Sequence, residues 1–146
     1  MKLASGDTKT RTPEHFTVAA NLRQAGDRMD QAIAAFARAT RMRLIDVVKA
    51  PNIDPGQSAQ EEVHVQKAID SLMEAVDLIS SAYTTSTRMK KNTESKELID
   101  CTTQLNVSFK TLLNDLQRPQ HRRIIAQLKQ ARRLIPNRLV KQLTKG

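Results

Sequence analysis

The chain has 146 residues, of which 39% are hydrophobic, 27% charged and only 3% aromatic. This length supports one domain with a modest core, and the apolar share exceeds that of a wholly disordered chain. No stretch approaches the roughly 20 consecutive apolar residues of a membrane span, and the first six residues lack the apolar region of a secretion signal. The single cysteine, Cys101, excludes an internal disulfide and a cysteine-based zinc cluster. We therefore expect a cytoplasmic or otherwise intracellular protein with no integral membrane association.

The net charge of +9 is concentrated at the C-terminal end of the chain. Nine of the 24 Lys and Arg residues lie within residues 118–146, which contain no acid. The 15 bases that remain balance the 15 acids of residues 1–117. A neutral body with a basic end is typical of a protein that contacts a polyanion or an acidic surface.

A first long helix is predicted to begin at Pro13, because Thr12 is a good N-cap and proline is favoured at the first helical position. Gly26 lies inside this pattern and costs about 1 kcal/mol relative to alanine. Asp27 could cap a fresh start, so the pattern leaves open whether the helix is continuous. After the end of this helix, turn-forming residues such as Pro51, Pro55 and Gly56 predict a loop over residues 50–57.

Two further helices show clear helical periodicity. The capping box Ser58-x-x-Glu61 predicts the start of the second helix, which should extend to about Lys90 despite the poor helix propensity of residues 84–87. The third helix is predicted from about Thr93 to Gln117. Apolar residues recur every three or four positions and define a seam on each helix: Val65, Ile69, Leu72, Val76, Ile79 and Tyr83 in the second, and Leu98, Cys101 or Thr102, Leu105, Phe109, Leu112 and Leu116 in the third. The predicted core comprises Val65, Ile69, Leu72, Val76, Ile79, Leu98, Leu105, Phe109, Leu112 and Leu116.

The fold class that follows is all-α, an antiparallel up-and-down bundle of about four helices, because short connections favour antiparallel neighbours. Residues 12–117 form the bundle, and residues 1–11, which are polar without a period, form a flexible N-terminal tail. Residues 118–146 form a basic amphipathic C-terminal helix, interrupted at Pro136 and packed on the bundle. The segment Leu72–Ala82, aliphatic with interspersed Ala and Ser, resembles helices of vinculin-type and talin-rod bundles; this resemblance carries no functional residue or partner.

The sequence offers no convergent catalytic chemistry. Glu61-x-x-His64 has the spacing used in carboxylate-bridged di-iron bundles, but one copy lacks the further ligands, so we expect no metal and no other cofactor. Cys101 lies on an apolar seam, where cysteine behaves as a small hydrophobe. The four glycines are never clustered, which excludes a phosphate-binding loop. We therefore expect a protein that is not an enzyme.

The basic C-terminal helix is the candidate functional site. One expectation is a non-enzymatic helical interaction or adaptor protein whose basic residues contact an acidic protein surface. Such a protein could also associate with itself as a homo-oligomer. The alternative is a nucleic-acid backbone bound with little sequence specificity, since no aromatic residue follows Phe109. A membrane-surface role lacks the usual Trp or Phe anchor. The apolar side of this helix and the missing aromatic residues favour the protein partner, although Ile124, Leu128 and Ile135 could also be core. The candidate binding residues are Arg122, Arg123, Lys129, Arg132, Arg133, Arg138 and Lys141.

Overall fold

The computed structural model describes residues 11–49, 59–116 and 121–144. Within these ranges the chain forms five helices and no strand, which confirms the all-α prediction. The helices are α2 (Pro13–Lys49), α3 (Ala59–Ser86), α4 (Thr93–Asp115), α5 (His121–Leu134) and α6 (Asn137–Thr144). Residues 1–10 of the predicted tail, and the predicted loop together with Ser58, lie outside the described residues. None of the helices in the described ranges combines the length and the apolar character needed to cross a membrane.

The helix α2 is one continuous helix of 37 residues. It begins directly after Thr12, as predicted, and the backbone N–H of Thr12 donates a hydrogen bond to Nδ1 of His15 at 3.0 Å. His15 therefore takes the position that glutamate or glutamine occupies in a capping box. The helix passes through Gly26 without a break, so Asp27 does not begin a new helix.

The ends of α3 and α4 follow from side-chain hydrogen bonds to the backbone. The helix α3 begins at Ala59, as the capping box predicts, but ends at Ser86, four residues before the predicted end. The Ser86 hydroxyl donates to the carbonyl of Tyr83 at 2.7 Å, and such bonds compete with the helical pattern. The next helix is capped by Asn92, whose side-chain oxygen accepts the backbone N–H of Ser95 at 2.8 Å.

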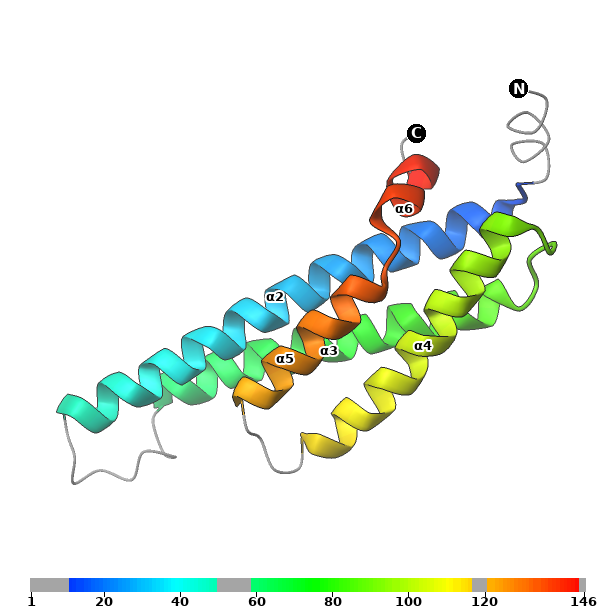
Figure 1. Cartoon of the computed structure of the whole chain (residues 1–146). Coiled ribbons are helices and arrows are strands. Elements are labelled where there is room, and N and C mark those ends of the chain that lie inside the picture. Colours follow the sequence, from blue (N-terminus) through cyan, green and yellow to red (C-terminus); the bar gives the residue numbers. More distant parts are fainter. Residues whose placement is uncertain (1–10, 50–58, 117–120, 145–146) are drawn as a thin grey trace.

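The helices α2 and α3 lie side by side in opposite directions and share the most extensive contact in the fold (Figure 1). Arg28 of α2 forms a salt bridge with Glu74 of α3, with Nε 2.7 Å from Oε2. Each helix carries fully buried alanines seven residues apart, and small side chains repeated on two adjacent helices allow their backbones to lie close together. These alanines are Ala25, Ala32 and Ala39 in α2 and Ala68, Ala75 and Ala82 in α3.

Most of the predicted core is confirmed, but the buried stripe of α3 is displaced from the predicted one. The prediction that Tyr83 lies on the buried seam is wrong, because its side chain is 36% exposed. Val65 is only partly buried. The fully buried positions of α3 include its three spaced alanines, which a search for large apolar residues overlooks. The predicted positions that are buried are Leu72, Ile79, Leu98, Leu105, Phe109 and Leu112, and Ile69, Val76 and Leu116 pack partly buried against them.

The remaining helices complete the core from the other side. The helix α4 packs on α3, and α5 contacts both α4 and α2 (Figure 1). The apolar side of α5 is buried as core at Ile124, Leu128 and Ala131, and Ile135, directly after the helix, is buried with them. Pro136 separates α5 from α6, as predicted, and α6 adds buried side chains while packing on α2.

Candidate polyanion-binding surface

Five of the seven predicted binding residues are exposed and form no ion pair with an acid among the described residues. Arg122, Lys129 and Arg133 are exposed on α5, and their spacing of seven and four residues places them along one side of the helix. Arg138 and Lys141 are exposed three residues apart on α6. None of the five forms a salt bridge with any acid in the part of the chain that the structure describes. We call these five residues the basic surface.

The other two predicted residues connect α5 to its neighbours. Arg123 approaches Asp115 of α4, with Nη2 3.5 Å from Oδ2, although its side chain stays 63% exposed. Arg132 lies beside Asp30 of α2, with Nε 3.3 Å from Oδ1. Its Nη1 also donates to the side-chain oxygen of Asn137 at 3.0 Å. The structure therefore separates the seven residues into an unpaired group and two that hold ion pairs.

The position of Arg132 explains the glycine inside α2. A Cβ atom placed on Gly26 would lie 2.9 Å from Cζ of Arg132 and 3.1 Å from its Nε and Nη1. Any side chain at position 26 would therefore require the guanidinium to shift away from α2. Glycine lowers helix propensity here but leaves the space in which Arg132 reaches Asp30.

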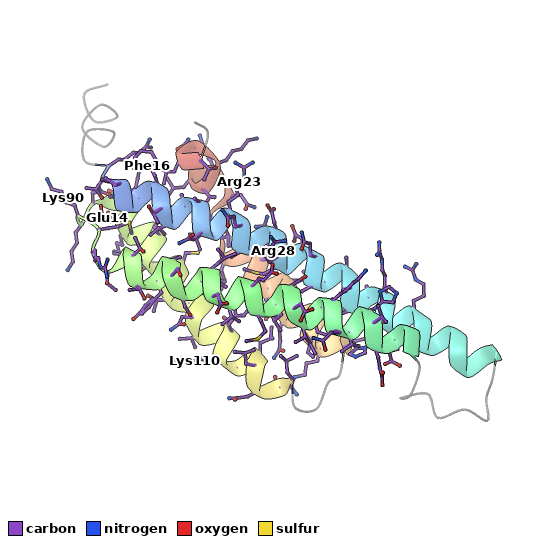
Figure 2. The ribbon with its side chains drawn as sticks, turned by 180° about the vertical axis from the view of Figure 1, so that it is seen from behind. Glu14, Phe16, Arg23, Arg28, Lys90 and Lys110 are labelled. Carbon is purple, nitrogen blue, oxygen red and sulfur yellow. The ribbon has the colours of Figure 1, made fainter. Side chains whose placement is uncertain are left out.

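A concave pocket of about 210 Å³ lies where α2, α5 and α6 meet. It contains Arg23, a residue that the sequence analysis did not select. The Nη1 of Arg23 donates to the hydroxyl of Thr144 at 3.1 Å, which places this arginine beside α6 (Figure 2). No linear pattern predicts that contact, because the two residues are 121 positions apart. The pocket is lined by Arg23, Asp27, Arg132, Ile135, Asn137, Val140 and Lys141.

A second, open groove of about 550 Å³ lies between α4 and α5 and is almost uncharged. Gln127 lies in it and donates from Nε2 to Asp115 at 2.8 Å. The groove holds no titratable side chain that could act as acid, base or nucleophile. Its lining residues are Thr103, Gln104, Val107, Ser108, Thr111, Gln127, Gln130, Ala131 and Leu134.

One buried histidine and serine lie within hydrogen-bonding distance, with Nε2 of His15 2.8 Å from Oγ of Ser95. The backbone N–H of Thr12 requires Nδ1 to be an acceptor, so Nε2 carries the proton and donates to Ser95. The Ser95 hydroxyl in turn donates to the backbone carbonyl of Lys90. Since both side chains are fully buried and the serine proton points away from the imidazole, the pair connects α2 to α4 and has no nucleophile geometry.

The remaining candidate groups are also placed by the fold. Cys101 is buried, and burial, with the nearby carboxylate of Glu97, raises the pKa of its thiol to about 12. Across the described ranges, no group of three or more His, Cys, Asp or Glu side chains could hold a metal ion. His64 of the Glu-x-x-His spacing lines a separate concavity between α2 and α3.

No protein-family model, curated protein or solved structure matches this chain. The residues and their geometry are therefore the basis for a functional proposal.

Proposed function

We propose that the protein is a non-enzymatic interaction protein, an up-and-down bundle of about four helices that binds a polyanion through the basic surface. The observation that carries this proposal is the set of five exposed cations on α5 and α6, two helices that contain no acid; within the described ranges none of the five forms an ion pair. Such a surface attracts anions at long range and gains affinity by displacing their counterions.

The partner that we favour is the phosphate backbone of a nucleic acid. The sequence favours an acidic protein partner because of the apolar side of α5 and the lack of Phe, Tyr or Trp after Phe109, but Ile124 and Leu128 are core and cannot contact a partner. Protein interfaces are usually centred on apolar or aromatic anchors, and phosphate contacts need only positive charge. Among the described residues, the exposed large hydrophobic side chains lie in α2, α3 and α4: Phe16, Val63, Met73, Tyr83 and Val107.

This arrangement predicts binding with little sequence specificity. The described residues of α5 and α6 include no Phe, Tyr or Trp that could stack on a base, and the ring of His121 packs against Phe36, with the ring centroids 5.6 Å apart. If all five cations of the basic surface contact phosphates of a duplex, log K should fall against log salt with a slope of about 0.9 for each phosphate neutralised.

The test is a titration of duplex and single-stranded oligonucleotides at several salt concentrations between about 50 and 200 mM. The double variant Arg122→Ala, Arg133→Ala should weaken binding and reduce the slope by up to about two. The control, Lys96→Ala with Lys110→Ala, removes the same charge from exposed positions of α4; Figure 2 shows Lys110 on that helix. It should leave the slope nearly unchanged.

Two results would contradict the nucleic-acid assignment. Equal losses in the two double variants would show that only net charge matters and that the basic surface is not the site. Failure of every oligonucleotide to bind at low salt, with poly-L-glutamate bound through Arg122 and Arg133, would assign the surface to an acidic polypeptide instead.

Sedimentation of the free protein in the same buffers tests the homo-oligomer expected from the sequence.

A further inference from the structure

The pocket where α2, α5 and α6 meet brings together cations from three helices. Arg23 comes from α2, Arg132 from α5 and Lys141 from α6, around a volume of about 210 Å³. Only Lys141 belongs to the basic surface, so this pocket extends the positive region onto α2. A concave site with converging donors holds an anion in a defined position, which a flat charged surface does not.

Both guanidinium groups in the pocket are held in place by polar partners. Arg132 lies against Gly26, and its Nε and Nη1 are fixed by Asp30 and Asn137. No described residue accepts a hydrogen bond from its Nη2, so two N–H groups of a positioned arginine stay available. Arg23 is oriented toward α6 by the hydrogen bond from its Nη1 to Thr144. Prior positioning lowers the entropy lost when an anion binds.

The charge of the pocket suits an anion of low charge. Three cationic side chains and one acid, Asp27, line it, and Asp30, which is not a lining residue, forms an ion pair with Arg132. The sum of these five groups is one positive charge, which matches the single negative charge of a phosphodiester. Asp27 is the group that should oppose a bound phosphate.

We propose that this pocket binds one phosphate group of a nucleic-acid backbone, with Arg23 and Arg132 donating N–H groups and Lys141 supplying an ammonium. This inference rests on the proposed function, and it adds Arg23 and Gly26 as residues that determine binding. Gly26 is a positioning residue, since it acts through Arg132.

The decisive variant is Gly26→Ala, because it changes no charge. Its Cβ would lie 2.9 Å from Cζ of Arg132 and force the guanidinium to shift, so oligonucleotide affinity should fall, by up to about tenfold if one charge-assisted hydrogen bond is lost. Arg23→Ala should lower affinity and reduce the salt slope by about 0.9, whereas Arg38→Ala, an exposed arginine further along α2, should do neither. Asp27→Asn should raise affinity, because it removes the negative charge that faces the phosphate.

The outcomes separate this inference from the proposed function. Unchanged binding in Gly26→Ala and Arg23→Ala, with the loss in Arg122→Ala, Arg133→Ala retained, would overturn the pocket and leave the proposed function standing. If the Gly26→Ala protein does not fold by circular dichroism, the opposite effects expected for Arg23→Ala and Asp27→Asn still decide the matter.

A second readout uses inorganic phosphate and the arginine side-chain NMR signals of the intact protein. Shifts of the Arg23 and Arg132 signals with oligonucleotide, and much smaller shifts with inorganic phosphate at equal concentration, are expected for a backbone phosphate. Equal or larger shifts with inorganic phosphate alone would assign the pocket to a free phosphate, and no shift with either would overturn it.

Discussion

Two fully buried polar side chains, His15 and Ser95, connect the start of α2 to the start of α4. Ser95→Ala should lower the free energy of unfolding by about 1–3 kcal/mol, because it leaves the Nε2–H of His15 buried without an acceptor. Urea denaturation measures the change. Ser81→Ala, at an exposed position of α3, is the control and should stay within about 0.5 kcal/mol of the parent. Equal stability of the two variants would contradict a structural role for this hydrogen bond.

The thiol of Cys101 should be almost unreactive in the folded protein. Burial, with the carboxylate of Glu97 nearby, raises its pKa to about 12, so very little thiolate forms at neutral pH. A chromogenic disulfide reagent at pH 8 should therefore react slowly with the native chain and rapidly in denaturant. Native reaction as fast as that of an unfolded control would place the thiol at the surface.

At the scale of the helices, the position of the buried stripe on α3 can be tested with two adjacent residues. Leu72 is fully buried and Met73 is 44% exposed. Leu72→Ala should lower the free energy of unfolding by about 2–5 kcal/mol, because it removes buried methyl groups and leaves a cavity. Met73→Ala should cost much less. Similar unfolding midpoints for the two variants would mean that α3 is rotated from the position described.

The start of α4 is also held by an ion pair that should make stability depend on pH. Arg11 donates to both carboxylate oxygens of Glu94, Nε to Oε1 at 2.7 Å and Nη2 to Oε2 at 2.6 Å. These hydrogen bonds lower the pKa of Glu94 from 4.5. A lowered folded-state pKa stabilises the fold above pH 4.5, and this contribution is lost as pH falls through the folded value.

Glu94→Gln should therefore reduce the loss of stability on acidification, measured as the denaturation midpoint between neutral pH and the onset of acid unfolding. Glu97→Gln, at an exposed position of the same helix, is the matched control and should follow the parent curve. A Glu94→Gln profile parallel to that of the parent would show that the Arg11 pair does not contribute.

For the whole molecule, local signals in the sequence predicted the helices well. The Thr12 cap, the start of α3 and the break at Pro136 each depend on neighbouring residues, so the sequence was sufficient for them. The sequence left open whether α2 continues through Gly26. It could not explain this glycine, because the Arg132 guanidinium that lies against it is 106 positions away. The buried stripe of α3 was misplaced because its alanines become important only through the close approach of α2.

The sequence predicted which segment of the chain carries the candidate site, but not how its side chains are arranged in space. Charge counting found all the cations of α5 and α6, since they lie within one short segment that contains no acid. It could not separate Arg123 and Arg132, whose acidic partners Asp115 and Asp30 lie on other helices. It also missed Arg23, which only the packing of α6 on α2 brings beside Lys141.

The unequal contacts of the five described helices imply an order in which parts of the molecule open. The α2–α3 pair shares the most extensive contact. The helix α6 is short, and its only extensive contact with another described helix is with α2. Amide hydrogen exchange should therefore be slowest in the alanine-rich centre of α2 and α3 and fastest in α6. Since Lys141 lies on α6, a ligand held there would stabilise the docked helix and slow its exchange. Binding would thus be coupled to the most easily detached segment of the described fold.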